Sequence, residues 1–454
     1  MIGILEKSTS IYRLGMLCAV LQPLVLAQST SVPARLTLDE AIDLALHNNH
    51  VLRIATDKVE ELQDAKRAAA SDYFPKLTNS SAFEHATQHN VVQFAEGSFG
   101  TFPILGPLPR NELIVNQDNL NHIYSRTQLT QPLTQLFRIH DANRSAEADV
   151  RVSRAELKDQ QLQIALAVRQ LYYGLLIAAA ESKAAAAVTA ASQREMTEAQ
   201  NDIAKGSALE VTLIQAKASV LQDQQQELLA RIQHDDLQAE FNNALGLPVD
   251  AAVELDDTPD QVQSPPSREE CMRLAESSEP TILAAAATVN KARAAVAAAR
   301  SEYIPDVSAF ARHDYQDGIA FLFHNYDTVG VSFNYELFEG GKRHAVVEER
   351  LMELAQAEEN LRRLKDEAAV TVKKALDKLE QSRHLVEVAK QVVELRAEGS
   401  RLSEVQVSYG TTLQSKRLQA VAELLQAHVD LLKADLSYSL SRAELDVAIG
   451  TLPR

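Results

Sequence analysis

Hydrophobic and polar residues alternate strictly along the stretch from Val329 to Leu337. The odd positions are Val, Val, Phe, Tyr and Leu, and the even positions are Gly, Ser, Asn and Glu. A period of two is typical of a strand with one apolar and one polar face. Gly340 and Gly341 interrupt the pattern, and a long stretch without Gly or Pro begins at Lys342. These residues predict a short amphipathic strand that leads through a Gly-Gly hinge into a very long helix.

The stretch after this hinge has the seven-residue spacing of a coiled coil. Two such series occur, at Leu354, Leu361, Ala368 and Ala375, and at Val372, Leu379, Val386 and Val393. Two offset seams on one helix indicate neighbours on both sides, as in a ring of helices. The 65 residues from Lys342 to Gln406 would form a helix roughly 100 Å long at ~1.5 Å per residue, which is deeper than a compact core.

The first half of the chain shows a comparable order of elements. Thr37 and Glu40 have the spacing of a capping box, which predicts that a helix begins there. A second helix stops before Pro75, because proline cannot continue it. The predicted elements are helices at 37–48 and 51–71, strands at about 76–94 and 113–133 joined by a long loop, long helices at 139–205 and 208–245, and a Pro-containing linker at 246–264.

The same order then returns, as an internal repeat. Five residues recur at an offset of 230: Glu40, Leu44, Ala45, Tyr73 and Pro75 correspond to Glu270, Leu274, Ala275, Tyr303 and Pro305. Beyond the strands the offset is 204: Leu133, Val168, Gly206 and Gly246 correspond to Leu337, Val372, Gly410 and Gly450. The first strand pair therefore carries 26 extra residues. The predicted repeats are 28–264 and 265–454, the second with helices at 267–301, a strand pair at about 306–337 and long helices at 342–449.

Aromatic residues gather where the strands are predicted. Of 23 Phe and Tyr residues, 17 lie in 73–137 or 303–338. Aromatic girdles are typical of membrane β-barrels, although aromatic side chains could also fill a soluble β core. Four strands cannot close a membrane barrel, and open edges in lipid would leave backbone groups unpaired. A barrel built from these strands would have to be shared between chains.

The N-terminus has the features of a secretory signal peptide over residues 1–27. Lys7 and Arg13 precede an apolar stretch, and Ala27 ends a plausible cleavage site. A membrane anchor fits less well, because Gln22 and Pro23 interrupt the stretch. The mature chain would keep one cysteine and, by inspection, no further run of about 18 apolar residues. The net charge of -17 and the pI near 5.2 argue against a nucleic-acid partner.

Motifs for enzyme chemistry do not emerge from the sequence. His47 and His50 are three residues apart, but at the end of a polar helix they are more simply solvent-facing. Gly340-Gly341-Lys342 lacks the first glycine of a phosphate-binding loop, because Glu336 stands there. We therefore predict no catalytic residues, no cofactor and no bound metal.

The order and doubled spacing of these motifs resemble the outer-membrane efflux protein family, the TolC-like channels. The motifs that carry the resemblance are the signal peptide, the two repeats, the glycine at each coil tip and the strand–helix junctions at Tyr73, Pro75, Pro132, Tyr303, Pro305, Gly340 and Gly341. The resemblance implies an α+β membrane protein and a homotrimer. Long antiparallel coiled-coil helices would form an α-barrel in the periplasm, and each chain would add four strands to a 12-stranded barrel in outer-membrane lipid.

The resemblance also implies function. Such channels are passive exit ducts of tripartite efflux pumps or type I secretion systems, without enzymatic activity. Their partners are a periplasmic adaptor (membrane fusion protein) and an inner-membrane transporter of the RND or ABC type. The alternative is a periplasmic coiled-coil adaptor or scaffold, which has one helical hairpin where this chain has two matching halves. A surface adhesin stalk would show longer heptad arrays and no Tyr-x-Pro before its strands.

The periplasmic end of the duct would lie at Gly206 and Gly410, and here the sequence departs from the family. Where TolC-like channels carry acidic residues near the tips, this chain has Thr212, Lys416 and Gln419. The Tyr and Arg that link helices at the TolC entrance match Val407 and Thr412. We hypothesise that Glu404, Tyr409 and Lys416 narrow the entrance instead, the alternative being that they are ordinary solvated residues.

Overall fold

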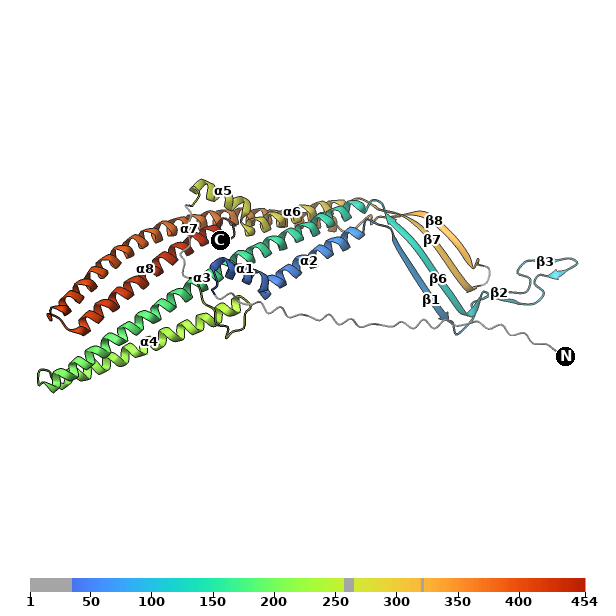
Figure 1. Cartoon of the computed structure of the whole chain (residues 1–454). Helices are drawn as coiled ribbons and strands as arrows, with labels where there is room; N and C mark the ends of the chain where they lie inside the picture. The colour runs from blue at the N-terminus through green and yellow to red at the C-terminus, as the bar shows by residue number, and fades with distance from the viewer. Residues whose placement is uncertain (1–34, 257–264, 320–321, 454) are drawn as a thin grey trace, which may run out of the picture.

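The structure is a computed structural model that describes residues 35–256, 265–319 and 322–453. The molecule is elongated, with a β-sheet at one end and the tips of two helical hairpins at the other (Figure 1). The helices are α1 (Leu38–Asn48), α2 (His50–Ser71), α3 (Leu136–Ala204), α4 (Glu210–Ala244), α5 (Arg268–Ser278), α6 (Pro280–Ser301), α7 (Lys342–Ser408) and α8 (Gln414–Ala448). The strands of the main sheet are β1 (Lys76–His85), β6 (Asp118–Pro132), β7 (Asp306–Ile319) and β8 (Asn325–Asn334).

The helices form one curved layer around two very long members, α3 and α7, of 69 and 67 residues. Toward the sheet, α2 and α6 flank α3; toward the tips, α4 and α8 do so, and α7 packs on α6 and α8 (Figure 1). The seam residues Val372, Leu379 and Val386 of α7 are buried, as their spacing predicts. The predicted long antiparallel coiled coils are confirmed, because α4 packs along α3 and α8 packs along α7.

Each repeat closes at the middle of the molecule, where its last helix ends against the turn between its first two helices. The last helix of each repeat ends at a glycine with positive φ, Gly246 (φ +70°) and Gly450 (φ +75°). Gly246 packs against Asn48, and Gly450 packs against the backbone of Ser278, which is the repeat counterpart of Asn48. A left-handed residue ends a helix at little cost only when it is glycine.

In the first repeat, a hydrophobic core lies beside this contact. Phe241 of α4 is fully buried and packs edge-on against Tyr172 of α3, with ring centroids 6.1 Å apart. The Tyr172 hydroxyl lies 3.0 Å from the Leu36 carbonyl oxygen and 2.7 Å from that of Asp256. The segments before α1 and after α4 are thereby joined to the long helix.

The capping box predicted at the start of α1 is confirmed. The Thr37 hydroxyl accepts a hydrogen bond from the Glu40 amide, and the Thr37 amide donates to Glu40 Oε2 at 3.0 Å. At the corresponding start of α5, the Ser267 hydroxyl accepts from the Glu270 amide, but the Glu270 carboxylate turns to Arg273. Hydrogen bonds from Thr37 lower the pKa of Glu40 below its usual value.

The main sheet is antiparallel with the order β1-β6-β7-β8, so the two strand pairs of the repeats join at β6 and β7. The prediction of one strand from Lys76 to Phe94 is wrong, because regular pairing with β6 ends at His85 opposite Asn121. The extra residues of the first repeat are also not a plain loop. They form a projecting hairpin from β2 (Val91–Phe94) and β5 (Leu113–Asn116), with β3 (Thr101–Phe102) and β4 (Gly106–Pro107) near its tip (Figure 1).

The strand predicted up to Leu337 ends at Asn334, and a turn through Gly340 (φ +60°) and Gly341 (φ +86°) leads into α7.

Against the expectation of no further apolar run, α3 and α6 each contain an 18-residue window apolar enough to cross a membrane by length and composition. Both helices are rich in alanine and pack within the helical layer, which accounts for their apolar character. The predicted signal peptide at residues 1–27 lies outside the described residues.

Candidate functional site

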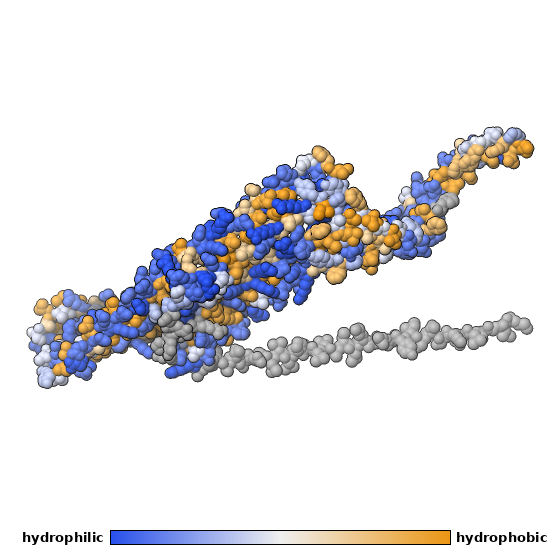
Figure 2. Space-filling model, turned by 90° about the horizontal axis from the view of Figure 1, so that it is seen from above, coloured by the Kyte–Doolittle hydropathy of each residue, from blue (hydrophilic) through white to orange (hydrophobic). Residues whose placement is uncertain are grey.

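The two faces of the main sheet differ sharply in polarity. On one face, neighbouring strands place Leu77, Leu129, Ala311 and Val329 side by side in register. Val331 and Phe333 extend this face toward the helices, and Val329 is 82% exposed. Apolar side chains are also dense where the helices meet the sheet and on the projecting hairpin (Figure 2). Exposed apolar rows of this length fit contact with lipid.

The edges of the sheet show how it must be completed. Within the described residues, β1 and β8 each pair with one neighbour only, so each leaves a row of backbone groups unpaired. In lipid these groups need partners, and the partners must come from further copies of the chain. The apolar face would then be the outside of a shared barrel, and the opposite face would line its interior.

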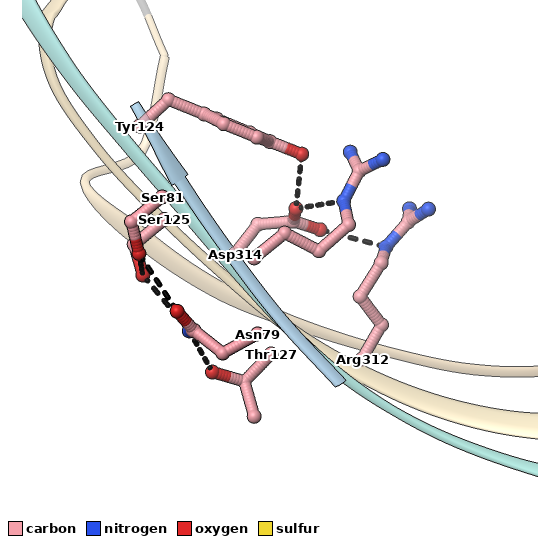
Figure 3. A network of polar contacts seen from close by, with 8 residues as sticks. Asn79, Ser81, Tyr124, Ser125, Thr127, Arg312 and Asp314 are labelled. Atoms are coloured by element: carbon pink, nitrogen blue, oxygen red, sulfur yellow. Dashed lines mark hydrogen bonds and ion pairs between the residues drawn. The ribbon is translucent and has the colours of Figure 1, made fainter. Parts of the chain in front are cut away.

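The opposite face carries a buried carboxylate between two arginines (Figure 3). The Asp314 side chain on β7 is 1% exposed. Its Oδ1 accepts a hydrogen bond from Arg126 Nε on β6 at 2.7 Å and one from the Tyr124 hydroxyl at 3.3 Å. Its Oδ2 lies 2.7 Å from Arg312 Nε. We call these four residues the arginine belt.

A separate polar network lies on the apolar side of the same strands. Asn79 Nδ2 donates to Thr127 Oγ1 at 2.8 Å, and the Ser81 and Ser125 hydroxyls are 2.9 Å apart (Figure 3). These residues lie farther from the helices than Leu77 and Leu129. Farther still from the helices, the exposed Phe83 and Ile123 pair on the same face, so the polar network interrupts an apolar surface that continues beyond it.

The predicted strand–helix junction residues lie together where the sheet meets the helices. Tyr73 and Tyr303 occupy equivalent turns just before Pro75 and Pro305, which precede β1 and β7. Pro132 ends β6, and the Thr134 hydroxyl two residues later donates to the Pro305 carbonyl oxygen at 2.6 Å. Gly340 and Gly341 lie at the fourth junction, where Arg343 donates to the Glu336 carbonyl oxygen at 2.8 Å.

The predicted entrance residues lie at the two hairpin tips. Gly206 (φ +72°) and Gly410 (φ +67°) form equivalent turns in which the next residue donates back to the helix, to the carbonyls of Asp202 and Gln406. Five of the predicted residues are exposed and two are half-buried. The exposed ones are Thr212, Glu404, Tyr409, Lys416 and Gln419, and the half-buried ones are Val407 and Thr412.

The tip region holds a contact that the sequence did not reveal. Glu198 of α3 accepts a hydrogen bond from the Ser415 amide at the start of α8, at 3.0 Å. Lys416 itself donates to Gln419 at 3.2 Å within its own helix. Near the tips, Glu198 therefore joins the hairpins of the two repeats, whereas no hydrogen bond or ion pair between the hairpins involves Val407 or Thr412 among the described residues.

Glu198 and the arginine belt were missed because their partners are remote in sequence. One signal for the belt was present: Arg312 and Asp314 share one face of a strand whose other face carries Ala311. For metal ions, no group of three or more His, Cys, Asp or Glu side chains within the described residues could form a site.

The comparisons with known proteins agree with this geometry. A family model described as outer membrane efflux protein matches residues 41–247 and 272–451, so its two segments follow the two repeats. This chain belongs to the outer membrane efflux protein family. No curated protein matches the sequence significantly.

Solved structures show the same fold as this efflux-family chain. The outer membrane channel CmeC of Campylobacter jejuni is 16% identical with a TM-score of 0.74, covering 91% of this chain and 85% of its own. The outer membrane protein VceC of Vibrio cholerae is 15% identical with a TM-score of 0.71, covering 92% and 97%. The open-state outer membrane channel MtrE of Neisseria gonorrhoeae is 15% identical with a TM-score of 0.67, covering 92% and 89%.

Family membership assigns the sheet to the outer membrane and the helices to the periplasm. The chain is an outer-membrane exit duct with a long periplasmic helical extension, and a passive conduit, not an enzyme. Trimers with a shared β-barrel and a helical barrel are typical of the family. In such a trimer, strands of the neighbouring chains would pair with the edge strands β1 and β8. The adaptor or scaffold alternative does not fit this membership.

Proposed function

We propose that this duct serves a tripartite efflux pump, in which a periplasmic adaptor holds its tips and joins it to an inner-membrane transporter of the RND or ABC type. One observation carries the proposal: the residue before each tip helix is an exposed leucine, Leu209 (74% exposed) before α4 and Leu413 (55% exposed) before α8. The two leucines are repeat counterparts. Exposed apolar residues at matching positions favour a docking surface for another protein.

Further apolar side chains surround these leucines. Val211, Ile214 and Tyr409 are all exposed close to the tips. A trimer would present six tips in a ring, with the apolar groups repeated at each. An adaptor of matching symmetry could bury them, and the hydrophobic effect would supply the affinity.

We propose as well that Glu404, Tyr409 and Lys416 narrow the entrance enclosed by these tips. All three side chains are exposed, and they flank the turn at Gly410. The acidic residues that other family members place there are replaced by Thr212, Lys416 and Gln419, so acidic side chains at those positions would not set the charge of the entrance.

Docking is tested in a strain that lacks its own efflux duct and expresses this chain with a candidate adaptor and transporter. We expect Leu209→Glu with Leu413→Glu to abolish cross-linking of the adaptor to the tips and to restore accumulation of the pump substrates. The double Leu→Met variant is the matched control, since it keeps an apolar side chain, and it should behave as wild type. Full resistance of the double Glu variant would refute the proposal.

The same strain separates efflux from type I secretion. In a pump, loss of the duct raises intracellular accumulation of small molecules. In a secretion system, loss of the duct would retain a protein substrate and leave small-molecule accumulation unchanged. The second result would assign this duct to protein secretion.

A further inference from the structure

We propose that the arginine belt is an anion-binding site inside the β-barrel, for solutes that carry carboxylate or phosphate groups. The belt consists of Arg126, Arg312, Asp314 and Tyr124 (Figure 3). The proposal concerns the barrel alone and does not depend on an adaptor at the tips.

The position of the belt follows from the register of the strands. Arg126 pairs with Asp314, and Arg312 pairs with Thr328, so these side chains share one face of the sheet. Ala311, which adjoins Arg312, lies on the other face, in the apolar row with Leu129 and Val329. A membrane barrel directs its polar face to a water-filled interior, so the belt lines the lumen.

The arginines are held in place while their outer nitrogens remain available. Arg126 Nε donates to Asp314 Oδ1 at 2.7 Å, Arg312 Nε forms an ion pair with Oδ2 at 2.7 Å, and no hydrogen bond of an Nη atom of either arginine occurs among the described residues. Arg126 lies over the Tyr124 ring, with Cζ 5.2 Å from its centroid, and Arg312 lies 6.0 Å from the centroid of Phe310. The guanidinium planes are therefore fixed before a ligand arrives, which lowers the entropy lost on binding.

The net charge of the belt favours anions. Two arginines and one aspartate leave one positive charge per subunit, in a chain whose total formal charge is -17. On the same face of β1, Lys76 and Glu84 carry opposite charges. A pair of free Nη groups matches the geometry of a carboxylate or phosphate, and three belts would face one lumen in a trimer.

The test measures currents through single trimers in planar bilayers, with inorganic phosphate added on the barrel side. That side gives access to the belt without passage through the tips. We expect wild-type trimers to prefer chloride over potassium and to show reduced conductance as phosphate binds. The double variant Arg126→Gln/Arg312→Gln should weaken phosphate binding by about tenfold or more, as expected from losing hydrogen bonds to a charged group.

Three further variants sharpen the test. The single variant Arg312→Gln, which keeps one ion pair to Asp314, should show a smaller loss in the same direction and serves if the double variant fails to assemble. His313→Gln changes the adjacent residue on the outer face and should leave phosphate binding unchanged. Lys416→Glu alters the tips and should also leave it unchanged. Phosphate binding that survives loss of the arginines, or depends on Lys416, would overturn the proposal.

Discussion

The two repeats share one backbone path but differ in the side chains that meet their surroundings. Gly246 and Gly450 close both repeats in the same way, and Gly206 and Gly410 turn both hairpins. At counterpart positions in the middle of the molecule, however, the first repeat has Phe241 and Asn242, where the second has Leu445 and Asp446. The backbone turns are thus common to both repeats, whereas side chains differ where the two repeats have different contact partners.

The pair Asn242 and Asp446 shows the reason for one such difference. The Asn242 amide donates to the carbonyls of Val249 and Ala251 in the linker, at 2.8 and 2.9 Å. Asp446 instead pairs with Arg442 at 3.1 Å. The same position therefore holds a donor where two carbonyl oxygens lie nearby and an acceptor where an arginine lies nearby.

The largest difference between the repeats should come from their closing glycines. In Gly450→Ala the new Cβ would collide with the Ser278 carbonyl oxygen, whereas in Gly246→Ala it would meet the Asn48 Cβ at 2.9 Å. Both changes cost about 1–3 kcal/mol for the left-handed backbone, and Gly450→Ala adds a backbone collision. We expect few heat-stable trimers for Gly450→Ala and a modest loss for Gly246→Ala, measured by heat dissociation in detergent. Equal losses would contradict the asymmetry.

The next largest difference in stability is expected between the counterpart core residues Phe241 and Leu445. Phe241→Ala should lower the unfolding free energy by about 3–5 kcal/mol, and Leu445→Ala by about 2–5 kcal/mol. We expect the loss at Phe241 to be the larger, because its ring also packs against Tyr172. Urea unfolding of the detergent-solubilised protein measures both. A larger loss at Leu445 would show that the second repeat holds the main core.

Asp446 should give the second repeat a pH dependence that the first lacks. Burial raises the pKa of Asp446 above its usual value of 3.8, although Arg442 opposes the shift. Between the usual and the raised value, the folded protein keeps a proton that the unfolded chain has released, so the unfolding free energy falls as pH rises.

The matched variants for this prediction exchange the two side chains. Asp446→Asn should remove the slope of unfolding free energy against pH in that range. Asn242→Asp should introduce a similar slope, because its new carboxylate would face two carbonyl oxygens. Unfolding curves recorded at several pH values measure both, and an unchanged slope in Asp446→Asn would assign the titration to another group.

The smallest effect is expected at the tips. Lys416→Glu changes the charge of each subunit by two units and Thr212→Glu by one, at counterpart positions of the two repeats. If both residues border the entrance, reversal potentials of single trimers should shift toward cations, more for Lys416→Glu. Unchanged ion selectivity in Lys416→Glu would mean that Lys416 does not contribute to the entrance.

Sequence reasoning succeeded where a pattern is local. The heptads at Val372, Leu379 and Val386 and the glycines at 340 and 341 fix helix and hinge through nearby backbone and side-chain preferences. It failed for the projecting hairpin, because Val91 and Leu113 could equally have continued β1 and β6. Only the loss of pairing after His85 separates the two outcomes.

The sequence by itself determined the repeat, the helix lengths, the turn at each tip and the family. Tertiary structure alone decided which residues meet across the sheet and between the hairpins. Arg126 and Asp314 are 188 residues apart, and Glu198 and Ser415 are 217 apart, so no local preference could bring them together. Strand register and helix packing act over such separations, and they depend on how all the apolar faces are buried at once.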